Sequence, residues 1–249
     1  MKKIIVCSLL LCSLIVVAQT PNTPITVPAS IKFEKNIVQK INSGKKERQM
    51  NYFFTGNGDY AAIKPEEKGS TSLIIYTKGG NMLIVNEKDK TIMVMNMGKF
   101  IGDAARIGKE MAEKRKDHPA NKDSMSVKSS FSKTGKTKTI CGYPAEEYEI
   151  KSEKGVMSVW YLKADFDTQL IYTMGMGNMG GQPALKNTEA VDKDFSGIPA
   201  FAKNYFMAEM ERNGKKSVET ISITKTDYSF SSAGYTIVDM GKLMKGQAN

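Results

Sequence analysis

The fold is decided by the stretch LIIYTKGGNMLIVNEKDKTIMVMNM, residues 73–97. Three apolar runs, residues 73–78, 82–87 and 91–97, are separated by Gly79-Gly80-Asn81 and by the charged residues 87–90. Short runs rich in Ile and Val and bounded by Gly, Asn or Asp are typical of strands joined by hairpin turns. The stretch therefore predicts three consecutive antiparallel strands.

The same strand character extends in both directions along the chain. Met50, Tyr52 and Phe54 alternate with Asn51 and Phe53, which is the period of a strand. Further runs with strand character are residues 59–64, 126–132, 138–140, 143–151 and 156–163.

The region 198–228 allows two interpretations. Residues 201–210 could form a helix, but Asn213-Gly214 lies between this run and residues 217–226. Asn-Gly between two extended runs favours a tight two-residue hairpin turn. We therefore expect a hairpin here.

One segment has a helical period. Phe100, Ala104, Ile107 and Met111 fall on one face of a helix, and charged residues occupy the other face. This pattern predicts an amphipathic helix over residues 99–115 with a single face to bury. Many strands with one inserted helix indicate the α+β class, with an antiparallel sheet in one domain. We expect this domain to cover residues 31–240, after a lead at 19–30 and before a tail at 241–249.

The first eighteen residues have the three parts of a secretory signal peptide. Lys2 and Lys3 precede the uncharged, apolar run 4–18, which ends at Ala18 before a polar stretch. A basic start, a short apolar region and a small residue at the cleavage point define such signals. We expect cleavage before Gln19, a periplasmic or secreted protein, and no transmembrane segment after cleavage.

The charge pattern argues against nucleic acid as a partner. The formal net charge is +10, and loss of Lys2 and Lys3 with the signal peptide lowers it to +8. The basic residues are interspersed with acidic ones, as in residues 45–48 and 113–117, rather than arranged as a stripe with aromatic residues. Solvated surface is the favoured interpretation, although a basic balance also suits an anionic headgroup or polymer.

The chain lacks the residues that most enzyme chemistries need. We therefore expect no catalytic function and no cofactor. His118 is the single histidine and lies beside Pro119 in a charged linker. Of the three cysteines, Cys7 and Cys12 belong to the signal, so three-His and Cys-based zinc sites are impossible in the mature chain. We expect Cys141 to be a small buried strand residue, and the stretch 134–137 to be a turn.

Residues 137–148, TKTICGYPAEEY, carry a family resemblance. This run, a Trp on the following strand (Trp160), the later residues 197–199 and the closing Phe230…Gly234-Tyr235 together resemble domain-of-unknown-function family 4412 (DUF4412). That family resembles the LolA and LolB lipoprotein carriers of the bacterial envelope. The resemblance implies a curved antiparallel sheet that forms an unclosed half-barrel around an apolar cavity, with residues 99–115 as a lid helix. It does not imply lipoprotein transport, because a fold alone does not fix a function.

Methionine is the most suggestive residue type, at 16 in the chain. Met93, Met95 and Met97 share one face of a strand, and a second group lies in a glycine-rich stretch. Thioethers bind Cu(I), but flexible Met side chains also line adaptable apolar surfaces or fill cores. A metal site would use the second group, which consists of Met174, Met176 and Met179.

These observations predict an exported, non-catalytic protein that binds an apolar ligand, such as a lipid or an acylated or lipoprotein partner. The alternatives are a Met-rich Cu(I)-binding module and a structural or interaction protein with a filled core. The candidate ligand-lining residues are Tyr52, Phe54, Met93, Met95, Met97, Ile107, Met111 and Trp160.

Overall fold

The computed structural model describes residues 26–44, 46–66, 72–97, 130–152, 155–172 and 203–246. The elements are β1 (Ser30–Lys32), β2 (Lys35–Asn42), β3 (Glu47–Phe54), β4 (Tyr60–Pro65), β5 (Ser72–Thr77), β6 (Asn81–Asn86), β7 (Thr91–Asn96), β8 (Ser130–Ile140), β9 (Tyr143–Ser152), β10 (Gly155–Lys163), β11 (Tyr205–Arg212), β12 (Lys215–Lys225), β13 (Ser229–Ser231), β14 (Thr236–Asp239) and the helix α3 (Met240–Gly246). None of the helical segments in these ranges combines the length and the apolar character that crossing a bilayer requires.

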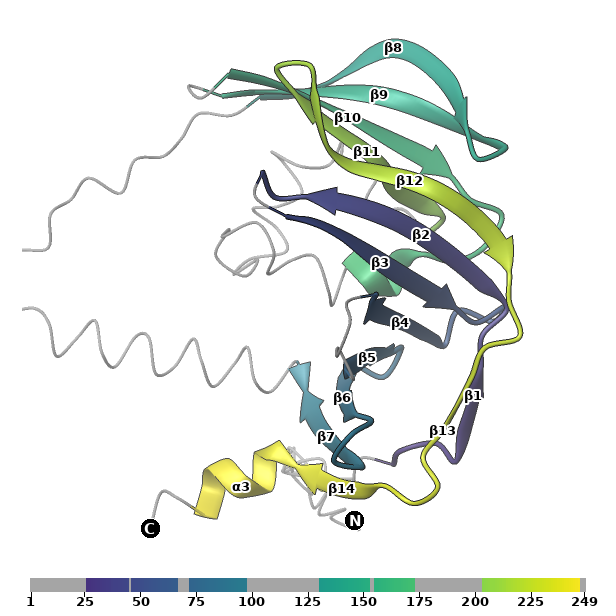
Figure 1. Cartoon of the computed structure of the whole chain (residues 1–249), viewed down its shortest axis with the longest axis vertical. Coiled ribbons are helices and arrows are strands. Elements are labelled where there is room, and N and C mark those ends of the chain that lie inside the picture. The colour runs from purple at the N-terminus through teal and green to yellow at the C-terminus, as the bar shows by residue number, and fades with distance from the viewer. Residues whose placement is uncertain are drawn as a thin grey trace, which may run out of the picture.

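Twelve strands form one large curved sheet in the order β14-β7-β6-β5-β4-β3-β2-β12-β11-β10-β9-β8 (Figure 1). Two meanders, β2 to β7 and β8 to β12, are joined side by side through the pair β2–β12. The end strands β14 and β8 do not pair with each other, so the sheet is unclosed. The expected antiparallel arrangement holds with one exception, because β14 runs parallel to β7.

The hairpins predicted from turn residues are present. Strands β5, β6 and β7 follow one another as antiparallel neighbours, as the stretch 73–97 predicts. The interpretation of 198–228 as a hairpin is confirmed, since β11 and β12 pair antiparallel. Asn213 and Gly214 both have positive φ, 51° and 73°, which is the conformation of a type I′ hairpin turn.

The second meander contains irregularities that favour curvature. The turn expected at 134–137 is instead a register shift inside β8, between Lys133 and Thr137, and the chain does not reverse there. Similar shifts interrupt the β10–β11, β11–β12 and β12–β2 pairs. An extra residue on one strand of a pair bends that strand and increases its twist. These bulges therefore help to curve this half of the sheet.

A two-stranded ribbon of β1 and β13 covers the outer, convex face of the first meander (Figure 1). Ile31 on β1 and Phe230 on β13 pack into a buried cluster with the side chains of β3 to β7 that point outward. Val27, in the expected lead, also packs against this cluster, which we call the outer core. It consists of Ile31, Phe33, Phe53, Ala62, Leu73, Ile75, Leu83, Val85, Ile92, Val94 and Phe230.

Strand β3 is buried on both faces. Phe53 points outward, and its ring lies 4.5 Å from that of Tyr228. Tyr52 and Phe54 point inward to Phe206 on β11, with ring centroids 5.4 and 6.2 Å away. The alternation in the sequence correctly predicts that Phe53 faces away from Tyr52 and Phe54.

The inner face around β3 is covered by the connector 164–172, which the sequence analysis did not identify as an element. Its Phe166 ring lies 5.1 Å from that of Phe54. Ala164 and Thr168 donate backbone hydrogen bonds to the residues just before β11, which hold the connector against the sheet. The predicted lid helix over 99–115 and the predicted signal peptide lie outside the described residues.

Phe206 connects the two meanders, and its loss should destabilise the whole sheet. Replacing a buried Phe with Ala usually costs about 3–5 kcal/mol, because it removes apolar contacts and leaves a cavity. We expect Phe206→Ala to lower the free energy of unfolding in urea by this amount. The exposed Val156 provides the control, because Val156→Ala should change it by less than about 0.5 kcal/mol. An equal, small effect of both changes would contradict the packing described here.

Candidate ligand-binding face

An unbroken row of apolar side chains crosses the inner face of the first meander. Residues directly opposite one another on neighbouring strands place their side chains on the same face, with Cβ atoms about 4.5–5.5 Å apart. From β2 to β7 this row, which we call the inner row, consists of Ile37, Tyr52, Ile63, Ile74, Ile84 and Met93. A second row beside it consists of Phe54, Ala61, Tyr76, Met82 and Met95.

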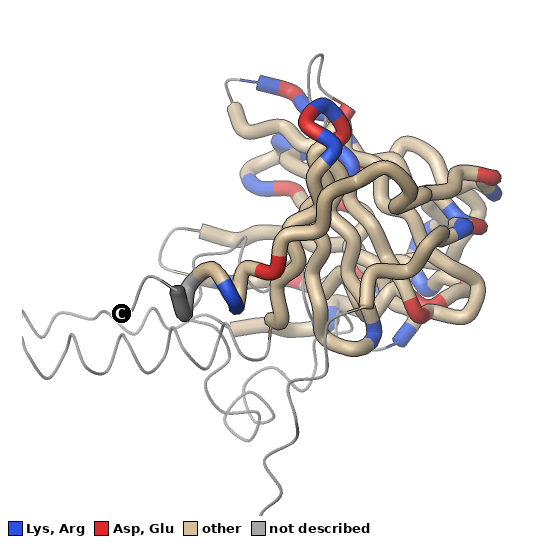
Figure 2. Tube along the Cα trace, turned by 90° about the horizontal axis from the view of Figure 1, so that it is seen from below, with Lys and Arg blue, Asp and Glu red and all other residues tan. Residues whose placement is uncertain are grey.

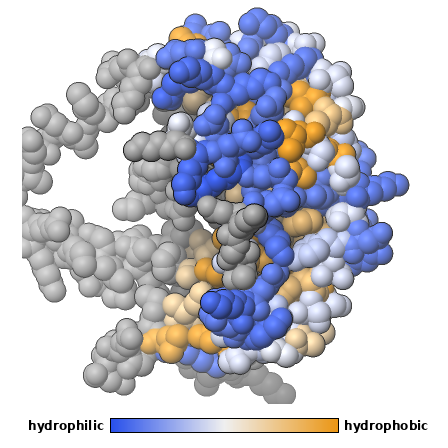
Figure 3. Space-filling view, in the orientation of Figure 1, coloured by the Kyte–Doolittle hydropathy of each residue, from blue (hydrophilic) through white to orange (hydrophobic). Residues whose placement is uncertain are grey.

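Burial of the inner face decreases from β2 toward β7. Ile37 and Tyr52 are fully buried in the inner core, the cluster that also contains Phe206. In contrast, Ile84, Met93 and Met95 are only half-buried and pack against neither the inner nor the outer core. Apolar surface is also visible at the lower left of Figure 3, over α3 and the neighbouring strands. The β6–β7 end therefore offers apolar side chains that the described residues do not fully cover.

The charged residues, in contrast, gather at turns and strand ends, with both signs side by side (Figure 2). Many of them form ion pairs, such as Lys64 with Glu87 at 2.9 Å and Lys133 with Glu146 at 2.8 Å. Partly exposed pairs of this kind contribute little to stability, about 0–1 kcal/mol each. They give the surface a mixed charge.

Buried polar groups accompany the apolar side chains of the inner core. The amide nitrogen of Gln39 donates hydrogen bonds to the carbonyl oxygen of Met207, at 2.7 Å, and to Oγ1 of Thr220, at 3.1 Å. The Met207 amide in turn donates to the hydroxyl of Tyr172. Hydrogen bonds thus link Met207, on β11, to Gln39 on β2 and to Tyr172 in the connector.

The tyrosines of the inner core keep their protons. Burial raises the pKa of Tyr52, Tyr76 and Tyr172, and it raises that of Tyr161 to about 12. Their hydroxyls are therefore neutral hydrogen-bond donors over the physiological pH range.

The predicted ligand-lining residues divide into three groups. Tyr52 and Phe54 lie in the inner core, as aromatic packing partners. Met93 and Met95 are half-buried on the inner face, and Met97 is buried, with its amide donating to the carbonyl of Gly80. The candidates in the predicted lid, Ile107 and Met111, and the alternative metal ligands Met174, Met176 and Met179 lie outside the described residues.

Trp160 is half-buried and packs against the inner core, although its neighbours in the strand register are charged. The register places it in one row with Glu209, Glu219 and Lys40. Lys40 points away from its neighbour Gln39, which shares a face with the inner row. Alternation shows which residues of a strand share a face, not which face is the inner one, so the ligand-lining role of Trp160 stays a prediction.

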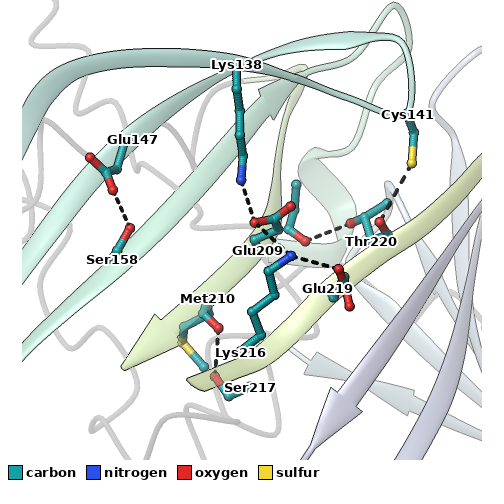
Figure 4. A network of polar contacts seen from close by, with 11 residues as sticks. Lys138, Cys141, Glu147, Ser158, Glu209, Met210, Lys216, Ser217, Glu219 and Thr220 are labelled. Carbon is teal, nitrogen blue, oxygen red and sulfur yellow. Dashed lines mark hydrogen bonds and ion pairs between the residues drawn. The ribbon is translucent and has the colours of Figure 1, made fainter. Parts of the chain in front are cut away.

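A cluster of charged groups surrounds Trp160. Lys138 Nζ lies 2.6 Å from a carboxylate oxygen of Glu209 and 4.2 Å from the centre of the Trp160 ring. Lys216 extends this cluster from Glu209 to Glu219, at 3.7 and 2.7 Å (Figure 4). Lys138 thus joins an ion pair to a cation–π contact that covers the indole ring.

Cys141 is an exposed turn residue rather than a buried strand residue. Cys141 and Gly142 have φ values of 50° and 86° and form the turn between β8 and β9. This geometry explains the Ile-Cys-Gly-Tyr sequence, because the turn needs positive φ at both central positions. The pKa of the Cys141 thiol is raised, mainly by partial burial and to a smaller extent by the nearby Glu209 carboxylate. Less of the thiol is therefore present as the nucleophilic thiolate. Among the described residues, no three His, Cys, Asp or Glu side chains are grouped as metal ligands.

A shallow cleft of about 300 Å³ lies at the turns that join β3 to β4 and β5 to β6. It is lined by Thr26, Asp59, Tyr60, Thr77, Lys78, Gly79, Asn81 and Leu83. Leu83 belongs to the outer core and Tyr60 packs against it, so the cleft lies on the other side of the sheet from the inner row.

Sequence reasoning missed Met82, Ile84, Gln39 and Tyr172. The signal for Met82 and Ile84 was present, because a register for the hairpin turn at residues 87–90 would have placed them on the face of Met93 and Met95. Gln39 and Tyr172 offered no such signal, because their contacts depend on pairings between distant parts of the chain.

Glu147, inside the conspicuous motif, is a buried carboxylate held by hydrogen bonds. It accepts from the hydroxyl of Ser158 at 2.7 Å, from that of Thr134 at 2.8 Å and from Lys136 at 3.0 Å. Burial alone would raise its pKa, but these hydrogen bonds outweigh burial and lower it. A carboxylate with a lowered pKa stabilises the fold above its unfolded-state pKa, and this contribution is lost as the pH falls through the folded-state value.

We therefore expect Glu147→Gln to reduce the free energy of unfolding by about 1–3 kcal/mol at pH 7. The difference from wild type should shrink as the pH falls from about 5 through the lowered pKa. Urea unfolding at several pH values measures it. Glu149→Gln, on the same strand but more exposed, is the control. A deficit that stays constant with pH would show that the ionised form of Glu147 is not what stabilises the fold.

Comparisons with known proteins identify a family. A search of curated proteins found no match. Among solved structures, PNGF-II in a C2 crystal form is 11% identical, with a TM-score of 0.40, over 87% of this chain and 32% of that one. The same protein in a P21 crystal form is 12% identical, with a TM-score of 0.36, over 86% and 32% of the two chains. The chain thus spans about a third of the length of PNGF-II.

An uncharacterized conserved protein from Thermus thermophilus is 7% identical, with a TM-score of 0.40, over 83% of this chain and 90% of that one. At these scores the structural likenesses carry no argument about function. The family model described as Domain of unknown function (DUF4412) matches residues 33–232. This match covers well over half of the 249 residues, and it includes the motif 137–148, Trp160 and Phe230. The chain belongs to the DUF4412 family.

Proposed function

We propose that this protein is an exported, non-catalytic binding protein that holds an apolar ligand against the inner face of its sheet. The ligand is a lipid or the acyl chain of an acylated partner. The observation that carries the proposal is the apolar surface of Ile84, Met93 and Met95, which packs into neither core. Removing apolar surface from water is favourable by about 25 cal/mol per Å², so a bound acyl chain would be stabilised here.

Side-chain chemistry and sheet geometry both support an acyl ligand. Methionine side chains are flexible and polarizable, and they adapt to chains of different shape. A curved, unclosed sheet presents its inner face to a ligand, as in the LolA-like half-barrel that the sequence resemblance implies. In this proposal the segment 99–115 acts as the lid over the inner face.

Copper binding is the second candidate function, and one observation favours it. Met82 on β6 lies directly opposite Met95 on β7, and Met93 is two residues away on the same face. Three thioethers within reach of one another form a soft site of the kind that Cu(I) prefers. The acyl ligand remains our first choice, because Ile84 lies within the same group and cannot bind copper.

The acyl-ligand proposal predicts that a charge on the inner face abolishes binding. We expect wild type to bind a fluorescent fatty acid at micromolar concentrations, and Ile84→Asp to weaken binding at least about tenfold, because the carboxylate would be desolvated beside the chain. Ile221→Asp changes an exposed Ile on β12 and should leave the affinity unchanged. Circular dichroism and the unfolding midpoint show whether each variant is folded. Absence of probe binding by wild type would refute the proposal.

The double variant Met82→Leu/Met95→Leu separates the two candidate functions. It keeps the apolar surface and removes two thioethers, so it should bind the fatty acid like wild type. Titration of Cu(I) against a chelator provides the second measurement. High-affinity Cu(I) uptake by wild type that the double variant lacks, together with no fatty-acid binding, would establish the copper function instead.

The export part of the proposal rests on residues 1–18 and has its own test. Expressed with its full N-terminus in a Gram-negative host, the protein should appear in the periplasm or the medium. N-terminal sequencing of that fraction should then begin at or near Gln19. An intact Met1 terminus in the membrane pellet would contradict export through a cleaved signal.

A further inference from the structure

The side chain of Gln39 has an unsatisfied acceptor in the inner core. Gln39 is 0% exposed, and its Oε1 atom has no hydrogen-bond partner among the described residues. Its orientation is fixed, because the Met207 carbonyl oxygen at 2.7 Å can only accept, so the amide nitrogen must face it. A buried carbonyl of this kind is normally paired with a donor, and native proteins contain few exceptions.

Hydroxyl donors without acceptors lie in the same core. Tyr172 accepts a hydrogen bond from the Met207 amide, and its own hydrogen has no acceptor among the described residues. Tyr52 and Tyr76 are 1% and 4% exposed, and their hydroxyls bond to no described residue. The rings of Tyr52 and Tyr172 both contact Phe206, at 5.4 and 6.0 Å.

Tyr52 and Tyr76 lie on the same face of the sheet. Tyr52 belongs to the inner row, on β3, and Tyr76 to the row beside it, on β5. Tyr172 contacts Phe206, as Tyr52 does. Tyr76 is directly opposite the half-buried Met82. The hydroxyls of Tyr52 and Tyr76 therefore belong to the part of the inner face where the buried core meets the apolar surface at β6 and β7.

We propose that Tyr52, Tyr76, Tyr172 and Gln39 form a polar subsite for an uncharged group of the bound ligand, such as the ester and free hydroxyl of an acylglycerol. This subsite rests on the proposed function, because it completes the same inner face. The acyl chain lies over Ile84 and Met95, and the polar group meets the tyrosines.

The chemistry of the subsite selects against a carboxylate. Protonated phenols donate to an ester carbonyl, and the Gln39 carbonyl accepts from a ligand hydroxyl. The cation nearest in register is Lys35, opposite Phe54, and both carboxylate oxygens of Asp165 already hold it at 3.1 Å. A fatty-acid carboxylate would therefore be desolvated at this subsite without a free cation to pair with among the described residues.

The test compares two ligands of equal chain length, a monoacylglycerol and the free fatty acid, on the full mature chain at pH 7. We expect the monoacylglycerol to bind at least about tenfold more tightly. The double variant Tyr52→Phe/Tyr76→Phe should lose most of this preference, because each lost hydrogen bond to the ligand weakens binding up to about tenfold. Its unfolding midpoint should stay equal or rise, since the two hydroxyls have no partner among the described residues. Tyr235→Phe, next to the outer core, is the matched control.

Any of the following results would overturn the subsite. If both ligands bind with equal affinity, or if the double variant keeps the wild-type preference, the tyrosine hydroxyls do not contact the ligand, while binding at the apolar surface still stands. If the double variant loses stability without a change in binding, these hydroxyls are satisfied by buried water. If neither ligand binds, the proposed function fails and the subsite fails with it.

Discussion

A sheet has two faces, and the apolar side chains on each of them must be kept from water; the architecture of this protein follows from that constraint. On the outer face the requirement is met by β1 and β13, which bring two distant parts of the chain together over the first meander. On the inner face the connector 164–172 and Phe206 cover only the region around β3. The described residues do not fully cover the half-buried apolar side chains of β6 and β7.

Local signals in the sequence predicted most of the strands and their hairpins. Gly79-Gly80-Asn81 and Asn213-Gly214 prescribe turns by their backbone preferences, and such preferences act within a few residues. The pairing of β2 with β12, the parallel strand β14 and the ribbon of β1 and β13 were not predicted. These contacts join segments far apart in the sequence, and nothing in either strand alone specifies its partner.

The difference between local signals and contacts between distant segments also explains which residues of the candidate site could be predicted. Met93 and Met95 could be chosen from alternation alone, but the inner side of a strand is decided by what the rest of the chain covers. A buried polar group such as Gln39 is harder still, because its neighbours come from β11 and the connector. The motif 137–148 was conspicuous for structural reasons, since it contains the tight turn at Cys141-Gly142 and the buried carboxylate of Glu147.

The inner core is unusual in what it buries beside its apolar side chains. A filled core gains most from apolar groups alone, because each buried polar atom without a partner costs about 1–3 kcal/mol. Tyr52 and Tyr76 could be Phe at no loss of packing within the described contacts, yet both carry hydroxyls. Stability alone does not account for these hydroxyls or for the unpaired Gln39 carbonyl, whereas in the proposed subsite they meet the polar group of the ligand.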